Sequence, residues 1–280
     1  MSVRKPAVAG SFYPKGRNEL QRMVRDSYTH PLGPGKEPPS APTRATVVSV
    51  VAPHAGYEYS GPVAAHSYLH VSSLRDPELV IVVAPNHYGV GSGVSAYSSG
   101  SWETPLGSLR VDEAAAKELA EDTGIVDFDP VSHRLEHSLE VQLPFLQMIY
   151  GDSVPLLPVC ISFQDQETTT ALAAGVANVA RERRTVLVAS SDLTHYEPAA
   201  EAKRKDMALI SEMLKMDIGA FYSTLERLQV TACGFGAIST VMQASKTLGL
   251  ARADLLKYAS SGDTTGDMAQ VVGYGSVRFV

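Results

Sequence analysis

The sequence predicts an α/β fold in which a buried, largely parallel β-sheet lies between two layers of helices, a three-layer αβα sandwich. Residues 47–52, 79–84 and 185–190 are three apolar runs rich in Val, with no regular alternation of polar residues. Such runs are typical of strands that are buried on both faces. Predicted helices separate the runs along the chain, which is the order of α/β folds. We therefore expect the three strands to lie in one sheet with their carboxyl ends on the same edge.

Length and composition predict one globular domain over residues 1–280. The chain has 280 residues, of which 44% are hydrophobic and 19% are charged, and this is ordinary for a domain with a sizeable core. The only loop-like stretch is residues 31–43, which contains five prolines and comes early in the chain. It predicts a long connection within one domain, because no similar stretch divides the middle of the chain.

Charge and cysteine content exclude several classes of protein. Lys and Arg number 24, Asp and Glu number 30, and the net charge is −6. Without a basic block there is no electrostatic case for nucleic acid or an anionic membrane as partner. No apolar run approaches the ~20 residues of a membrane-spanning helix, and the N-terminus lacks the apolar core of a signal peptide. Two cysteines do not make a disulfide framework, so we expect a cytoplasmic protein.

The first half of the chain predicts an arm, three helices and a hairpin around the first two strands. Residues 3–14 suggest an extended arm, and residues 18–27 have the apolar spacing of a short amphipathic helix. Gly61-Pro62 is expected to open a helix that runs to about Val71. Two short segments suggest a β-hairpin, and a capped helix should follow them. These three elements are expected at residues 94–97, 107–111 and 112–122.

The second half continues the alternation of helices and strands. Residues 133–150 contain a predicted helix with a kink or boundary at Pro144. The prolines of residues 154–161 suggest a bent or edge strand. The remaining helices are expected at residues 168–183, 201–215, 218–228 and 237–248. The last two strands are expected at residues 255–260 and 270–280.

Histidines and one cysteine follow the predicted strands where ligands usually bind. His54, His87 and His195 come just after the three apolar runs, and Cys233 lies between small residues near the start of a predicted helix. A lone histidine is more often structural, but three at equivalent strand ends favour a shared site. Imidazole and thiolate suit Fe(II), Zn or copper better than Mg or Ca. The helix start would also favour the thiolate of Cys233.

Several of these residues have a plain structural interpretation beside the functional one. Cys233 has the size and polarity of a small buried core residue. Asp192 either orients His195 within one turn or caps a helix. His137 lies four residues after His133 and three before Glu140, a spacing that is typical of a surface pair on a helix. We interpret His66, His70 and Cys160 as structural.

Seven segments of the chain carry a resemblance to the Memo family (mediator of ErbB2-driven cell motility). In chain order they span nearly the whole sequence and read VRKPAVAGSFYP, APHAGYEYSGPVAAHSY, APNHYG, EHSLEVQLPFL, SSDLTHY, ACGFGA and SSGDTTGDMAQVVGYGSV. The combination in this order is far more specific than any one of the segments.

The resemblance implies a fold similar to class III extradiol dioxygenases, which are nonheme iron enzymes with two histidines and a glutamate on the metal. His54 and His87 match the two histidine ligands, Cys233 takes the place of the carboxylate, and His195 matches the acid/base histidine. The cysteine departs from the dioxygenase pattern. The resemblance therefore implies metal-dependent redox or oxygen chemistry with iron or copper, zinc also being possible, and radical-SAM partner proteins in microbes.

Three functions follow from these observations. The leading one is a mononuclear metal site formed by His54, His87 and Cys233. In that interpretation, three nearby residues would be catalytic, and a small molecule or peptide would bind in the cleft. The three catalytic residues would be His195, Asp192 and His137. The second is a non-catalytic module that binds a peptide or partner protein. The third is a metal-free enzyme with Cys233 as nucleophile and His195 or His87 as base.

Overall fold

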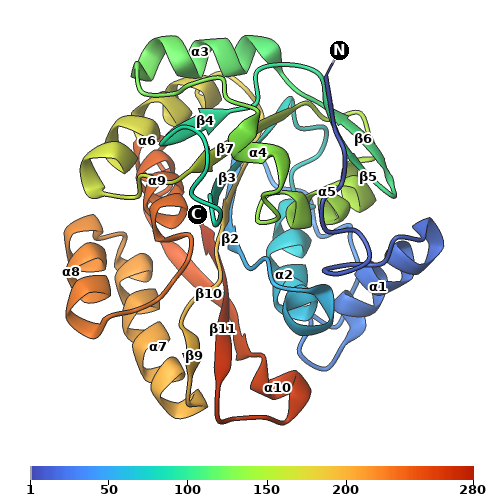
Figure 1. The fold of residues 1–280 in the computed structure, drawn as a ribbon, viewed down its shortest axis with the longest axis vertical. Helices are drawn as coiled ribbons and strands as arrows, with labels where there is room; N and C mark the ends of the chain where they lie inside the picture. Colours follow the sequence, from blue (N-terminus) through green and yellow to red (C-terminus); the bar gives the residue numbers. More distant parts are fainter. Residues whose placement is uncertain (1) are drawn as a thin grey trace.

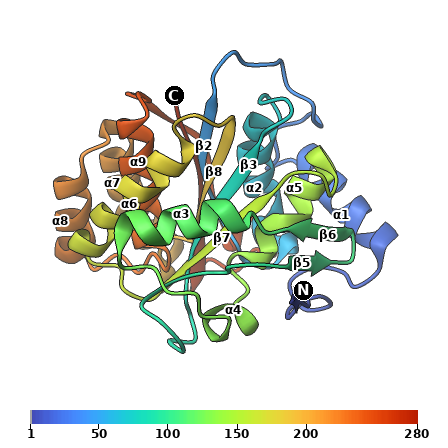
Figure 2. The ribbon, with the colours of Figure 1, turned by 90° about the horizontal axis from the view of Figure 1, so that it is seen from above.

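Four adjacent parallel strands form the centre of the main sheet. The computed structural model describes residues 2–280 (Figure 1). The order of the four strands is β2, β8, β3 and β7, which are labelled in Figure 2. Their bounds are β2 (Val47–Ala52), β8 (Thr185–Ser190), β3 (Leu79–Pro85) and β7 (Leu156–Ile161). The three strands expected from the apolar runs are therefore neighbours, and their carboxyl ends lie on one edge.

Antiparallel strands extend this sheet on both sides. The full order is β10-β11-β2-β8-β3-β7-β4, and the short β9 pairs with β11. These strands are β4 (Val94–Ala96), β9 (His195–Glu197), β10 (Ala253–Ser260) and β11 (Val271–Phe279). A separate small sheet contains β1 (Val3–Arg4), β5 (Ser101–Thr104) and β6 (Gly107–Arg110).

Helices cover both faces of the main sheet, as Figure 2 shows most clearly, and this confirms the three-layer αβα sandwich. One layer contains α1 (Arg17–Thr29), α2 (Tyr57–Val71) and α5 (Leu143–Tyr150). The other contains α3 (Glu113–Thr123), α6 (Gln166–Ala180), α7 (Ala199–Lys215), α8 (Ile218–Leu228) and α9 (Phe235–Thr247). Three short helices complete the chain: α4 (Val131–Arg134), η1 (Glu140–Gln142) and α10 (Gly262–Thr265).

The strand residues alternate between two hydrophobic cores, one under each helix layer. Val48 and Val50 of β2 pack in the core beneath α1 and α2, whereas Val47 and Val51 pack in the core beneath α6 and α9. Successive side chains of a strand point to opposite faces, so an unbroken apolar run can fill both cores. The apolar runs therefore place the strands in the sheet interior.

Two prolines occupy positions that differ from the expected ones. Helix α2 begins at Tyr57, so Pro62 lies inside it and does not open it. Strand β7 lies between β3 and β4, not at an edge of the sheet. Pro158 is tolerated there because its carbonyl accepts from Tyr97, just past the end of β4. The missing N–H of Pro158 faces the same side, where no ladder bond is needed.

The segment from His133 to Tyr150 is not one helix. Helix α4 ends at Arg134, and five non-helical residues precede η1 and α5. The residues of this link, 135–139, include His137, so the helical face that would pair His137 with Glu140 does not exist. The expected hairpin is also rearranged, because β5 pairs with β6 and β4 joins the main sheet.

The N-terminal arm is held against the body by one buried carboxylate. Glu140 pairs with Arg4 and accepts hydrogen bonds from the backbone of Ala7 and Val8 and from the hydroxyl of Tyr13. Arg4 and Glu140 are both buried. A buried ion pair with every lone pair satisfied fixes the path of the arm, because either charge alone would be strongly disfavoured.

Replacing Glu140 with Gln should therefore destabilise the protein by about 3–5 kcal/mol, since Arg4 would remain buried without its counter-charge. Urea denaturation measures the change in the free energy of unfolding. Glu103→Gln is the matched control, because Glu103 pairs with Lys5, whose side chain is 71% exposed. We expect it to change stability by about 0.5 kcal/mol or less. Equal effects of the two substitutions would contradict the structural role of Glu140.

Candidate metal centre

Three potential ligand side chains converge at the carboxyl edge of the central strands. His54 follows β2, His87 follows β3, and Cys233 precedes α9. One nitrogen of each imidazole and the sulfur of Cys233 all lie within 4.8 Å of one another. Donor atoms that close together can bind a single ion, which needs distances of about 2.0–2.3 Å to each donor.

Ser190 determines which nitrogen of His54 carries its proton. The Ser190 hydroxyl donates to the carbonyl of Ser138 (2.7 Å) and accepts from the amide of Gln142 (2.7 Å). The orientation of that amide is set by Tyr68, whose hydroxyl donates to Oε1 of Gln142. Ser190 has no second proton, so Nδ1 of His54, 2.8 Å away, is the donor in their hydrogen bond. The Nε2 lone pair of His54 is left free for a ligand.

Glu136 orients His87 in the same way. Its carboxylate binds Nδ1 of His87 at 2.9 Å and the backbone N–H of His87 at 2.6 Å, and it also accepts from Ser138. Burial raises the pKa of Glu136, but the hydrogen bond and charge of His87 and the nearby His137 outweigh this and lower the pKa to about 2. The ionised carboxylate holds the proton of His87 on Nδ1 and leaves Nε2 free.

Cys233 lies against His54, with Sγ 3.2 Å from Nε2. The approach depends on Gly234, where a Cβ would lie 2.3 Å from the carbonyl oxygen of Ser190. The cysteine does precede a helix, as expected, but the helix start does not dominate its titration. Burial and the charge of Asp192 raise the pKa of the thiol. In the metal-free protein the environment therefore favours the protonated thiol, contrary to the expected thiolate.

Asp192 joins the strand ends and does not cap a helix. It lies in the non-helical segment after β8, is buried, and accepts from the backbone N–H of His54 (2.8 Å). Burial raises the pKa of this carboxyl group. Asp192 therefore ties the loop after β2 to the loop after β8, directly beneath the candidate ligands.

His195 and His137 lie on two other walls of the same cleft. Nδ1 of His195 bonds to the carbonyl of Thr231 (3.0 Å), so its Nε2 is left without a proton unless the ring is charged. The ring of His137 stacks on that of His87, with centroids 4.6 Å apart, and contacts Phe12 of the N-terminal arm. Burial lowers the pKa of His137 to about 4. The surface-pair interpretation of His137 is therefore wrong.

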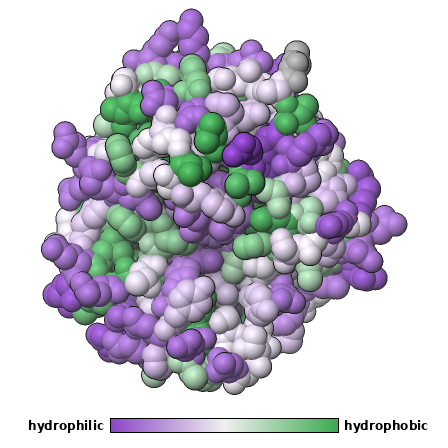
Figure 3. Space-filling view, viewed as in Figure 1, coloured by the Kyte–Doolittle hydropathy of each residue, from purple (hydrophilic) through white to green (hydrophobic). Residues whose placement is uncertain are grey.

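A cavity of about 650 Å³ unites these residues. Five of the six side chains predicted for the site line it, and the sixth, Cys233, contacts His54. The five are His54, His87, His137, Asp192 and His195. Figure 1 shows β9 and α10 beside β11, and residues of these segments form the outer wall of the cavity. On the face of the molecule that Figure 3 shows, hydrophilic side chains dominate the outer margin of the molecule, and smaller hydrophobic patches lie between them.

Sequence reasoning missed Glu136, Ser190 and Gln142, and it considered Glu140 only as a helical neighbour of His137. Glu136 orients His87, whereas Glu140 of the same segment holds the arm. The only sequence signal for Glu136 was its position directly before His137. Neither the strand-terminal Ser190 nor Gln142 stands out by residue type.

His66, His70 and Cys160 lie outside the site, in agreement with their structural interpretation. His66 bonds to the carbonyl of Leu32, and His70 has a pKa lowered to about 4 by burial. Cys160 is buried within β7. His133 is also buried, beside Ser95 and among aromatic rings.

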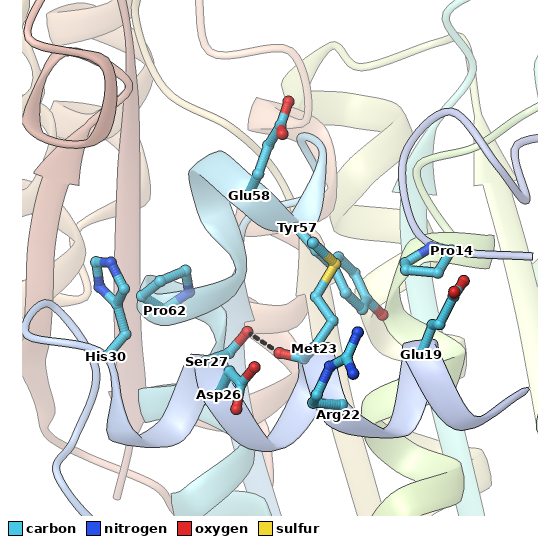
Figure 4. A pocket seen from close by; sticks show the side chains of 10 residues that line it. All are labelled: Pro14, Glu19, Arg22, Met23, Asp26, Ser27, His30, Tyr57, Glu58 and Pro62. Atoms are coloured by element: carbon cyan, nitrogen blue, oxygen red, sulfur yellow. Dashed lines mark hydrogen bonds between the residues drawn. The ribbon is translucent and has the colours of Figure 1, made fainter. Parts of the chain in front are cut away.

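A smaller cavity of about 350 Å³ lies between α1 and α2 (Figure 4). Met23 of α1 and Tyr57 of α2 form its inner wall, and Arg22 and Glu58 lie at its rim. Within residues 2–280, the groups of three or more potential metal ligands occur only around His87, in the larger cavity. The candidate site is therefore the larger one.

The fold and the donor atoms define an αβα protein with a candidate mononuclear site of two imidazoles and one thiol at the carboxyl edge of its sheet. The comparisons with known proteins identify its family. The family described as Memo-like protein matches residues 4–278. The chain belongs to the Memo family, as its sequence motifs indicated.

Curated relatives match over almost their whole length. A MEMO1 family protein of Nitrosopumilus maritimus is 46% identical over 99% of this chain and 100% of its own length. One from Methanopyrus kandleri is 44% identical over 99% of this chain and 98% of its own. The crystal structure of an uncharacterized protein from Escherichia coli K12 has a TM-score of 0.57 at 15% identity, covering 83% of this chain and 99% of that one. This last likeness concerns the fold alone.

None of the helices within residues 2–280 combines the length and the apolar character that crossing a bilayer requires.

The buried His133 predicts a loss of stability in acid. Burial, with the charge of Arg4, lowers its pKa from 6.5 to about 3. His133 therefore binds a proton near pH 6.5 in the unfolded chain but only near pH 3 in the folded protein. The stabilisation that is present above pH 6.5 is lost as the pH falls from 6.5 to about 3. We expect roughly 3–5 kcal/mol of this loss to be absent in His133→Phe. Urea denaturation between pH 7 and pH 3 measures it, and parallel curves for the two proteins would contradict the assignment.

Proposed function

We propose that this protein binds one redox-active metal ion, iron or copper, through His54, His87 and Cys233, and presents it to a small molecule in the adjacent cleft. Zinc also suits the donor set. The observation that carries the proposal is the hydrogen bonding of the two imidazoles, which fixes the nitrogen that carries the proton in each ring. Nδ1 of each imidazole is occupied by a hydrogen bond, to Ser190 or to Glu136, and each Nε2 is left free. Nε2 of His54 lies beside the sulfur of Cys233, and one nitrogen of His87 lies within 4.8 Å of both.

The residues fit such an ion by chemistry as well as by position. Histidine ligands commonly donate their other N–H to a carboxylate or hydroxyl, and this raises their basicity and fixes their orientation. Three protein donors leave coordination positions open toward the cleft. A bound ion of this kind would supply electron transfer or Lewis acidity to a molecule in the cleft. It would also displace the thiol proton of Cys233, so binding should strengthen as the pH rises.

The remaining cleft residues suit proton transfer and positioning. His195 offers an unprotonated Nε2 to the cavity, because Thr231 holds the proton on Nδ1. His137 is neutral near pH 7 and covers one side of His87. Asp192 keeps the backbone of His54 in place. We propose that His195 exchanges protons with the ligand, while His137 and Asp192 shape the space around it.

The alternatives fit these observations less well. A metal-free enzyme with Cys233 as nucleophile would need a thiolate, but burial and Asp192 disfavour it. A non-catalytic module that binds a peptide or partner protein would use the same cleft, and the free Nε2 atoms would then have no purpose. Radical-SAM partner proteins, and a dioxygenase-like oxidation, stay predictions from the family resemblance.

Metal content tests the proposal directly. We expect wild-type protein reconstituted with Fe(II) or Cu(I) to retain about one ion per chain. His54→Ala, His87→Ala and Cys233→Ser should each lower the affinity by about tenfold or more, because a ligand matters at least as much as its supporting residues. Elemental analysis after gel filtration, with titration of each metal, gives the measurement.

Cys160→Ser is the matched control, since Cys160 is buried in β7, where its thiol donates to the carbonyls of Pro85 and Ser132 and lies outside the ligand group. It should bind metal as the wild type does. Equal metal content in the wild type and the three ligand variants would refute the site. Stoichiometric metal without turnover of any oxidisable small molecule under oxygen would favour the binding module.

A further inference from the structure

The outer wall of the cleft has a composition that the proposed metal site does not explain. Tyr59, Tyr196 and Tyr274 line it together with Asp267. They come from α2, β9, β11 and the segment after α10, so four separate parts of the chain bring them to one wall. None of them supplies an atom to the group formed by His54, His87 and Cys233.

Tyr196 is held in an unfavourable position on this wall. Its φ of 57° lies in the left-handed region, which bulky residues rarely adopt, and its side chain is 73% exposed. The neighbours on both sides enforce this conformation, because His195 and Glu197 pair with β11 across an irregularity in register. Strain of this kind persists where the surrounding structure imposes it, and it is common at ligand-binding sites.

Apart from the histidines, the charged side chains that line the cleft within residues 2–280 are limited to carboxylates. Asp192 lies at the inner end and Asp267 at the outer end, and the lining drawn from residues 2–280 includes no Lys or Arg. Asp267 accepts one hydrogen bond from the backbone of Ala269 through Oδ1, which leaves its other oxygen available. Aromatic faces beside a carboxylate attract organic cations, and the carboxylate repels an anion.

We infer that the outer half of the cleft binds the positively charged end of a small organic ligand, an ammonium or related cation held against the tyrosines and Asp267. The inference rests on the proposed function for its orientation, because the other end of the ligand would then face His54 and His87. It names the substrate class of that site as cationic and predicts weaker binding of carboxylates at the outer wall.

Three probes with the same phenylethyl group test the charge preference: 2-phenylethylamine, 2-phenylethanol and 3-phenylpropanoate. Calorimetric titration of the full-length, metal-free protein at pH 7 should show the amine binding about tenfold more tightly than the carboxylate, with the alcohol between them. Absence of amine binding at millimolar concentration, or equal or tighter binding of the carboxylate, would overturn the inference.

Substitutions test which residues cause the preference for the amine. Asp267→Asn should remove most of the preference for the amine over the alcohol, whereas Glu226→Gln removes an exposed charge on α8 outside the cleft and should leave it intact. Tyr196→Ala should weaken amine binding roughly 3–10-fold, and Tyr196→Phe, which keeps the ring, should restore it. Unchanged amine affinity in both Asp267→Asn and Tyr196→Ala would show that the outer wall is not the site.

The metal proposal can fail independently of this inference. His54→Ala leaves Tyr59, Tyr196, Tyr274 and Asp267 in place, so it should lose metal and keep the charge preference. A wild-type protein that binds no metal but prefers the amine would refute the metal site alone. A protein that binds metal through His54 but shows no preference would refute the cation site alone.

Discussion

The candidate site depends on the parallel pairing of β2, β8 and β3, because this pairing brings three strand ends to one edge of the sheet. The segments that follow these strands must leave the sheet at the same place, and their polar residues therefore meet. Asp192 strengthens the junction by binding the backbone of His54 from the next strand end. Without that alignment the two imidazoles would belong to unrelated loops.

Hydrogen bonds beneath the ligands turn this meeting of loops into a defined chemical site. Ser190 and Glu136 each accept a hydrogen bond from Nδ1 of one histidine. Both also bond to the backbone of Ser138, Ser190 to its carbonyl and Glu136 to its N–H. Since an imidazole can use either nitrogen, the buried partners decide which one faces the cleft. The segment after α4 is therefore as important to the site as the strands, although it contributes no proposed ligand.

Two carboxylates of that segment have separate roles. Glu136 faces His87, whereas Glu140 holds Arg4 and the backbone of the N-terminal arm. The arm then brings Phe12 against His137, and Phe12 forms part of the cleft wall. The first residues of the chain are thus connected through one buried ion pair to the environment of the candidate metal site.

The sequence by itself determined the central strands, because strands buried on both faces need unbroken apolar runs, and helices with local cap signals, such as the one that Asp112 caps. It also named His54, His87 and Cys233. The tertiary structure alone decided the roles of Glu136 and Glu140, four residues apart and alike in type, and the interior position of β7 despite Pro158. The physical reason is that segments distant in sequence decide which group a buried polar side chain bonds to. They also decide on which side of a strand a missing N–H is tolerated, and no local pattern encodes either.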